Sequence, residues 1–248
     1  DDAHAALDAG GLAEEHVALA PVLLQANVRE VRAVGIDLRP VAGGPKLAEE
    51  RGTPSGDGEA QESELESMLA DQQAAIEAFV ATQGPEHSRV AAAMNNLGNT
   101  YYTQGKLDAA IEQFEGALEI RRKSLGDEHL DVAYCHQNLG NARWMKGELG
   151  PAASHYQKAV DIRAAKLDAQ HPRLALSRAN LGGLLCELER WDACEEQLRL
   201  ALEAREGKLP AGHPDITRSR MALAAAHEGR GALDQASALI AQVEAGMD

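Results

Sequence analysis

Apolar side chains recur along the chain in two short helical patterns separated by a polar turn. Over residues 90–101 they are spaced by four, three and four positions, which places them on one face of a helix. The turn QGKLD follows at 104–108, with Gly105 where the end of a helix favours a left-handed residue. A second apolar stripe then comprises Ala110, Ile111, Phe114, Ala117 and Leu118. The pattern predicts a pair of antiparallel helices.

The same pattern returns with a period of 42 residues. Four histidines mark this period without a slip, and they are His87, His129, His171 and His213. A Leu-Gly pair recurs in three of the copies, and a small residue followed four positions later by a bulky one recurs in all four. Each hairpin can bury its apolar face only against its neighbours, so the hairpins must stack into an array. The predicted units are 87–128, 129–170, 171–212 and 213–248.

The run L-G-x-x-Y at 97–101, followed by Ala110-x-x-x-Phe114, resembles the tetratricopeptide repeat. The period of 42 residues and the sequence of the first unit are similar to the 42-residue variety of this repeat found in kinesin light chains. That sequence is HSRVAAAMNNLGNTYYTQGKLDAAIEQFEGALEIRRKSLG. The resemblance covers residues 87–248. It implies an all-α fold, a right-handed superhelical solenoid of antiparallel helix hairpins. The sequence shows no sustained heptad by which a light chain would join its motor, so the resemblance extends to the repeat type alone.

The first 86 residues differ from the repeats. Residues 62–86 are interpreted as a degenerate, incomplete repeat, because residues 68–86 align with the second helix of a unit. Residues 1–61 are interpreted as an acidic, partly disordered segment in which 12–19 and 22–34 are candidate short helices. We interpret this segment as an acidic tail, and an arm ordered by a partner is the alternative.

Asparagines and aromatic residues occupy a second set of positions on the first helices of the units. This set is offset from the apolar stripe by one residue, or about 100° around the helix. In tetratricopeptide repeats the second set lines the concave groove, where amides can bind a peptide backbone and aromatic rings add contact area. The resemblance therefore implies a peptide-binding groove formed by Asn95, Asn99, Tyr102, Tyr134, Gln137, Asn141 and Trp144. The alternative is that these side chains hold neighbouring helices together, and this is the role that we expect for Asn96, Asn138 and Asn180.

The polar character of this set fades along the array. The third unit has Ala179 and Gly183 at the equivalent positions, and the fourth has Met221 and Ala225. We therefore expect the first two units to form the polar recognition end, and the later units to accept apolar side chains.

The histidines and cysteines are not expected to form a metal site or a disulfide framework. Packed helices lie about 8–10 Å apart, so equivalent atoms of successive repeats lie about twice that distance apart, whereas zinc ligands lie about 2 Å from the ion. The histidines are predicted instead to close the turn between repeats and to cap the following helix. Among the three cysteines, Cys194 takes a slot that alanine fills in the other units, and Cys186 at a groove position is a candidate reactive thiol. The third is Cys135, and no pairing is expected.

Composition narrows the class of partner. The chain is 44% hydrophobic and only 3% aromatic, which suits packed helices. A net charge of −15 disfavours nucleic acid and anionic lipid as partners, and no apolar run reaches the roughly 20 residues of a membrane span. The acidity is concentrated in residues 1–86, at −12, against −3 in residues 87–248. We expect an intracellular, reducing compartment, either the cytoplasm or, if a targeting segment has been removed, an organelle.

No nucleophile–base pair, phosphate-binding loop or carboxylate dyad stands out, so no catalytic residue, metal or cofactor is predicted. We expect a non-catalytic module that binds a segment of a protein or peptide partner along the groove, within a larger complex. The alternative is a fixed structural or assembly subunit of a large multiprotein complex, held through its edges and its N-terminal arm. An array that regulates an attached catalytic domain is a third option that the sequence leaves open.

Overall fold

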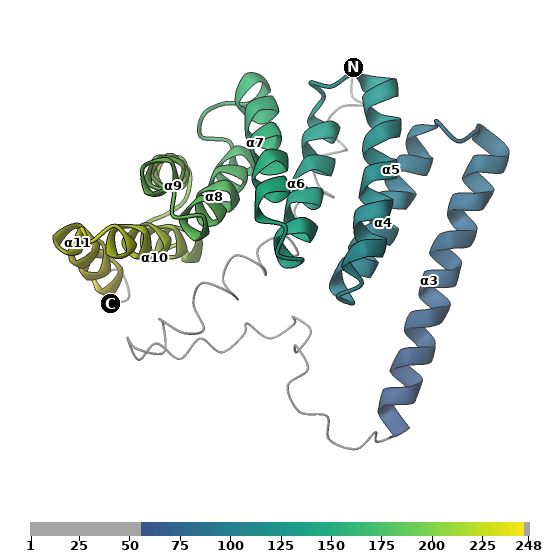
Figure 1. The fold of residues 1–248 in the computed structure, drawn as a ribbon, viewed down its shortest axis with the longest axis horizontal. Helices are drawn as coiled ribbons and strands as arrows, with labels where there is room; N and C mark the ends of the chain where they lie inside the picture. Colours follow the sequence, from purple (N-terminus) through teal and green to yellow (C-terminus); the bar gives the residue numbers. More distant parts are fainter. Residues whose placement is uncertain (1–55, 246–248) are drawn as a thin grey trace. The chain divides into compact units, whose positions relative to one another are not determined.

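A computed structural model describes residues 56–245, with side chains described from residue 67 onward. The candidate short helices at 12–19 and 22–34 lie outside these residues. Within residues 56–245 all regular structure is α-helical, and no strand occurs (Figure 1). The helices are α3 (Gly56–Gln83), α4 (Ser88–Thr103), α5 (Leu107–Leu125), α6 (Leu130–Met145), α7 (Leu149–Lys166), α8 (Pro172–Glu187), α9 (Trp191–Glu206), α10 (Pro214–Gly229) and α11 (Leu233–Glu244). None of them is long and apolar enough to cross a membrane.

The chain divides into two compact units, and the division falls inside α6, between Cys135 and His136. The described part of the first unit is 56–135, and that of the second is 136–245. Each unit has its own apolar core. The core of the first includes Val90, Leu97, Ile111, Phe114 and Leu118. That of the second includes Trp144, Tyr156, Leu174, Leu181, Leu184, Leu198 and Leu223.

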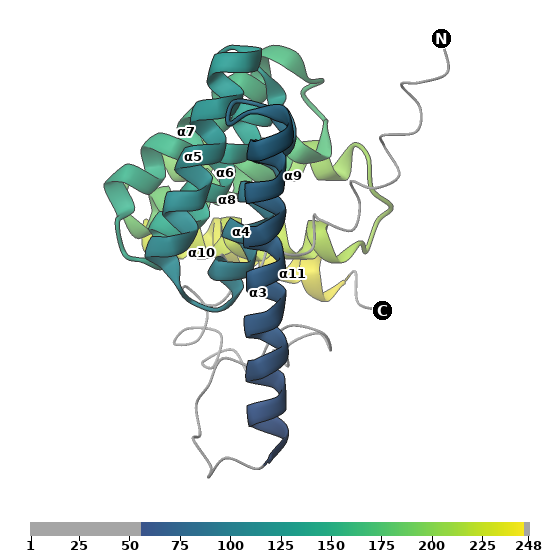
Figure 2. The ribbon, with the colours of Figure 1, turned by 90° about the vertical axis from the view of Figure 1, so that its right-hand side faces the viewer.

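The long helix α3 crosses the boundary that the sequence predicts between residues 61 and 62. Leu69, Gln72, Ile76 and Phe79 are half-buried at spacings of three, four and three, which defines one face of this helix. α3 packs against α4. The N-terminal half of α3 extends past the end of α4 (Figure 2).

The predicted helix caps are present. In each of the four repeats, the histidine that marks the start of the repeat accepts a hydrogen bond through Nδ1 from the backbone N–H two residues later, at 3.1–3.2 Å. Pro172 and Pro214 follow their histidines as the first residues of α8 and α10. The prediction that these histidines cap helices is therefore confirmed.

The turn inside each hairpin requires a left-handed residue. Gly105 supplies it in the first repeat with a φ of 72°, and Glu189 takes the equivalent place in the third repeat with a φ of 56°. Glutamate is rare in this conformation, so the turn of the third repeat keeps the geometry of the glycine turns despite its side chain.

The repeated Leu-Gly pair lets the two helices of a hairpin approach closely. A Cβ atom placed on Gly98 would lie 2.6 Å from the ring of Phe114, and one on Gly140 would lie 2.6 Å from Tyr156. In the third repeat, a Cβ on Gly182 would lie 2.8 Å from Leu198. The glycine and the bulky residue sixteen positions later therefore form one packing contact, which the fold repeats with its period.

Candidate functional site

Four of the seven predicted groove residues belong to the unit 56–135. Asn99, Tyr102 and Tyr134 are half-buried and so retain access to solvent, whereas Asn95 is buried. The guanidinium carbon of Arg121 lies 5.9 Å from the centre of the Tyr134 ring, within range of a cation–π contact. Burial raises the pKa of Tyr102, whose hydroxyl is enclosed without a hydrogen-bond partner among the described residues. This unit therefore keeps one amide and two aromatic side chains at a partly open surface.

The other three predicted groove residues lie in the unit 136–245 and are buried. Gln137, Asn141 and Trp144 are 2%, 5% and 4% exposed. Asn141 Oδ1 accepts a hydrogen bond of 2.6 Å from the hydroxyl of Tyr156, and Trp144 Nε1 donates to the carboxylate of Glu187. Asn95 is buried as well, so these four side chains do not offer the accessible surface that lining a groove requires. Their participation in partner binding stays a prediction.

The three asparagines expected to hold helices together differ from one another. Asn138 and Asn180 are buried, as that role requires, whereas Asn96 is exposed. Both polar atoms of the Asn180 amide are buried without a hydrogen-bond partner among the described residues.

On the first helices of the unit 136–245, the accessible residues at the groove-equivalent positions are apolar on α8 and mixed on α10. On α8, four residues at the positions equivalent to the predicted groove are half-buried, namely Leu176, Ala179, Gly183 and Cys186. On α10, Arg218 and Met221 are half-buried, and Ala225 and Glu228 are exposed. Within each unit taken by itself, we call the half-buried and exposed residues at these positions the first-helix strip of that unit. In the unit 56–135 its members are Ala92, Asn99, Tyr102 and Tyr134, and in the unit 136–245 they are Leu176, Ala179, Gly183, Cys186, Arg218, Met221, Ala225 and Glu228.

A series of arginines links the second helix of one repeat to the first helix of the next. Arg163 of α7 donates to Gln137 Oε1 at 3.0 Å and to the hydroxyl of Ser177 on α8. Arg205 of α9 likewise donates to the hydroxyl of Ser219 on α10. Within the unit 56–135, Arg121 of α5 donates to the carbonyl oxygen of Asp131 at 3.2 Å and to Cys135 Sγ at 3.4 Å. The sequence analysis missed this series, although both the arginines and their acceptors recur with the 42-residue period.

Burial shapes the electrostatics of these arginine links. It lowers the pKa of the Arg205 guanidinium, against the opposing charge of Asp215. It also raises the pKa of the Cys135 thiol, although Arg121 acts in the opposite direction. Cys135 is therefore held as a neutral thiol inside its unit.

A histidine pair lies beside the arginine series in the unit 136–245. The Nδ1 atoms of His136 and His155 are 2.9 Å apart, so one ring donates and the other accepts. Burial, together with the charges of Arg143 and Lys158, lowers the pKa of His155 to about 4. Among the described residues, no group of three or more His, Cys, Asp or Glu side chains is placed to hold a metal ion.

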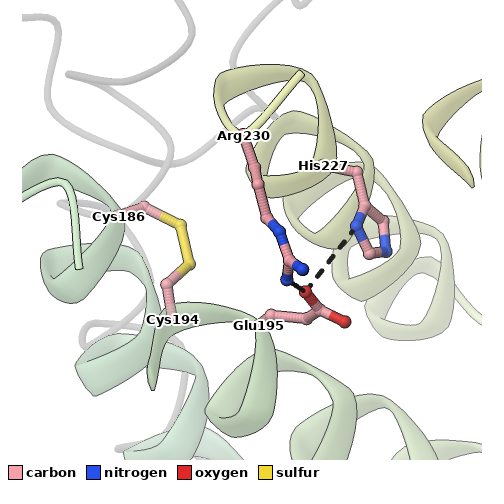
Figure 3. The surroundings of a disulfide bond; sticks show 5 residues. All are labelled: Cys186, Cys194, Glu195, His227 and Arg230. Carbon is pink, nitrogen blue, oxygen red and sulfur yellow. Dashed lines mark hydrogen bonds and ion pairs between the residues drawn. A yellow bond between two sulfur atoms is a disulfide. The ribbon is translucent and has the colours of Figure 1, made fainter. Parts of the chain in front are cut away.

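Two of the cysteines form a disulfide, and the expectation that they would remain unpaired is wrong. Cys186 is the penultimate residue of α8 and Cys194 lies in the first turn of α9, with their Cα atoms 5.2 Å apart (Figure 3). The hairpin turn brings these two positions together, which is within the range that a disulfide spans. Cys194 is fully buried in its alanine slot, as expected, but it is not a free thiol.

Comparison with known proteins identifies the type of repeat. A family model described as tetratricopeptide repeat matches residues 90–131 and 174–215, two stretches that start two periods apart. None of the curated proteins matches the chain.

Solved structures share the fold at low sequence identity. The nearly identical TPR-like repeats of a proposed kinesin light chain from Podosopora anserina are 23% identical, with a TM-score of 0.66, and the match covers 75% of this chain and 89% of that one. BtubC (BKLC) from P. vanneervenii is 22% identical with a TM-score of 0.63, over 77% of this chain and 74% of that one. The apo form of RapI is 18% identical with a TM-score of 0.65, over 77% and 67% of the two chains.

Proposed function

We propose that the chain binds a protein partner through the first-helix strips of its two units, because two stretches of it match a tetratricopeptide-repeat model and it folds as kinesin light chain-like repeats do. Tetratricopeptide arrays are protein-interaction scaffolds, and their helix pairs leave one set of first-helix positions open to a partner. The observation that carries this proposal is the mixed chemistry of that set, which combines an amide with aromatic and apolar side chains and, on α10, with two charged ones.

In the unit 56–135, the strip suits an extended polypeptide segment. The amide of Asn99 offers both a donor and an acceptor, which match the carbonyl and N–H groups of a peptide backbone. Tyr102 and Tyr134 lie on the same strip and supply large ring surfaces, which bind at little cost in side-chain entropy. This part of the strip therefore favours a segment bound by its backbone and by ring contacts.

In the unit 136–245, the α8 part of the strip and Met221 favour apolar side chains of a partner, whereas Arg218 and Glu228 add charged groups on α10. Leu176 and Met221 contribute partly accessible apolar surface, and Ala179 and Gly183 leave room beside Leu176 on α8. A ligand segment with large aliphatic or aromatic residues can bury this surface, at about 25 cal/mol per Å².

A second candidate function is that of an assembly subunit held through its edge. Leu233, the first residue of α11, is 64% exposed, whereas the equivalent residues Leu107, Leu149 and Trp191 are half-buried. An exposed leucine where equivalent residues are covered favours a contact between this edge and another protein.

A crosslinking pull-down from the native source can separate the two functions by means of a pair of single variants. If the strip binds the partner, Asn99→Ala should lower its recovery by about tenfold, the effect of losing roughly 1.4 kcal/mol of binding free energy, whereas Leu233→Glu should leave recovery unchanged. If the edge holds an assembly, Leu233→Glu should release the whole complex and Asn99→Ala should have no effect. Far-UV circular dichroism and thermal melting of both variants serve as the folding control.

A further inference from the structure

The Cys186–Cys194 disulfide belongs to one repeat only. Alanine occupies the positions equivalent to Cys194 in the other repeats, at Ala110, Ala152 and Ala236. The positions equivalent to Cys186 hold Tyr102, Trp144 and Glu228. The first, second and fourth repeats form the same hairpin, with the small residue buried against the core, and their described residues contain no cross-link. The hairpin of the third repeat therefore does not depend on the disulfide for its fold.

The two sulfur atoms of this bond differ in their access to solvent. Cys194 is fully buried within the core of its unit, whereas Cys186 is half-buried at the C-terminal end of α8. A thiolate breaks a disulfide by attacking one of its sulfur atoms, and access to that atom is one determinant of the rate. Of the two, Cys186 offers the approach from solvent.

The first turn of α9 is also an anchor for the end of α10. Glu195, the residue after Cys194, accepts a hydrogen bond from Arg230 and lies 4.0 Å from His227 Nδ1 (Figure 3). Asp192 lies 3.3 Å from Arg230 as a second ionic partner. A Cβ atom on Gly229 would lie 2.5 Å from the ring of Trp191, so the end of α10 is packed directly on the first residue of α9. The same turn of α9 is thus bonded covalently to α8 and non-covalently to α10.

We propose that Cys186 is a redox-modification site, at which a low-molecular-weight thiol such as glutathione exchanges with the disulfide and releases the first turn of α9. The glutathione thiolate attacks Cys186 Sγ, and the bond to Cys194 breaks with its electron pair on Cys194, which takes up a proton. A second glutathione thiolate then attacks the glutathione sulfur of the mixed disulfide and displaces Cys186, which is protonated in turn. Two glutathione molecules are oxidised to one glutathione disulfide, and the protein gains two electrons and two protons.

Reduction leaves the third repeat folded and acts on its neighbour. The freed Cys194 side chain occupies the slot that alanine fills in the other units, where a small apolar group is already accommodated. The first turn of α9 loses its covalent link to α8, so Asp192, Glu195 and Trp191 hold the end of α10 less firmly. The effect is therefore expected at residues 226–232, which comprise the last turn of α10 and the turn that leads into α11.

The test uses the full chain in a Cys135→Ser background, because serine occupies the equivalent positions at Ser177 and Ser219. The protein is equilibrated with mixtures of reduced and oxidised glutathione, quenched with N-ethylmaleimide, and mapped by peptide mass spectrometry. Glutathione should be trapped on Cys186. Hydrogen exchange of residues 226–232 should become about threefold faster on reduction, as expected for weakened ion pairs of this exposure. The variant Cys194→Ala should match the reduced chain in both redox conditions.

Three outcomes would overturn the proposal. The first is that Cys186 and Cys194 both react with N-ethylmaleimide in protein purified without reductant. The second is that glutathione is trapped on Cys194 instead of Cys186. The third is an exchange rate of residues 226–232 that does not differ between the oxidised and reduced chains.

Discussion

The side chain of Arg163 is predicted to determine how firmly the second and third repeats are joined. It is 4% exposed and donates to Gln137 on α6 and Ser177 on α8, with the carbonyl oxygen of Arg173 at 3.4 Å. Ser177 also donates to Gln137 at 2.9 Å, so these two side chains remain bonded to each other when the arginine is removed. Arg163→Met therefore removes the charged donor and leaves its two side-chain acceptors satisfied.

The cost of this substitution follows from two opposing terms. Two hydrogen bonds from a charged donor contribute about 1.5–3 kcal/mol each, or about 3–6 kcal/mol together. Removal of a buried guanidinium recovers part of this energy, because the desolvation penalty of several kcal/mol disappears with the charge. We expect Arg163→Met to lower the free energy of unfolding by about 2 kcal/mol. Arg163→Lys should cost at least as much, since it keeps a buried charge on a shorter side chain, whose ammonium ends short of the position of Nη1, the atom that donates to both acceptors.

Urea unfolding followed by circular dichroism measures the effect, and it also reports the coupling between repeats. Weakening a link between neighbours in a repeat array lowers cooperativity, so the transition should broaden as well as shift. Arg199→Met is the matched control, because Arg199 is an exposed arginine that pairs with Glu196 and Glu203 on its own helix, and its loss should cost less than about 1 kcal/mol. Wild-type stability in Arg163→Lys would refute the reasoning, because charge alone would then account for the link. Equal costs for Arg163→Met and Arg199→Met would refute it as well.

Two further predictions concern packing and pH. Gly140→Ala should destabilise the chain by about 1–2 kcal/mol in urea unfolding, because the added Cβ meets the buried ring of Tyr156 at 2.6 Å. The control is Gly150→Ala, whose added Cβ has no atom within 4 Å, and it should leave the free energy of unfolding unchanged or raise it by up to about 1 kcal/mol. His155 has a pKa of about 4 in the folded chain and an ordinary value of 6.5, so the unfolded chain binds its proton first as the pH falls. The free energy of unfolding that His155 contributes should therefore be complete above pH 6.5 and decrease between pH 6.5 and 4, by about 1 kcal/mol for a half-buried ring. The measurement is the urea midpoint as a function of pH. If this dependence is the same in His155→Gln as in the wild type, the prediction is contradicted.

The sequence predicts the hairpins well because their determinants are local and repeated. The 42-residue spacing, the histidine caps and the Leu-Gly pairs each occur several times, so an error at one copy is corrected by the others. The arginine series could have been found in the same way, since Arg121, Arg163 and Arg205 share the period. It was missed because basic residues at the end of a helix already have a sufficient local explanation in the helix dipole.

The disulfide was missed because a periodic comparison relates residues of different repeats to one another. Cys186 and Cys194 occupy two different slots of the repeat, and each was compared with its equivalents instead of with the other cysteine. The contact between them arises from the hairpin turn, which places the end of α8 beside the start of α9. Pairing within one hairpin has to be checked separately from the period.

Exposure could not be predicted from the angular offset of the groove positions alone. The angular offset considers a helix that packs against a single neighbouring helix. α6 instead forms hydrogen bonds both with α7 of its own repeat and with α8 of the next repeat. Gln137 shows this directly, because its side chain accepts hydrogen bonds from Arg163 on α7 and Ser177 on α8. A first helix with neighbours on two sides buries a wider arc than a single apolar stripe indicates, which explains why Gln137, Asn141 and Trp144 are buried.

Equivalent asparagines can still differ in role, and the sequence contains the reason. Asn141 is buried and accepts a hydrogen bond from the hydroxyl of Tyr156, whereas Asn99, one period earlier, is half-buried. The residue equivalent to Tyr156 in the first repeat is Phe114, which has no hydroxyl to donate to Asn99. Replacing Asn141 would therefore leave the buried Tyr156 hydroxyl unpaired and lower stability, confounding any loss of binding with a loss of structure. Asn99→Ala therefore does not leave a buried tyrosine hydroxyl unpaired, and a partner that binds the strip should be sensitive to this substitution.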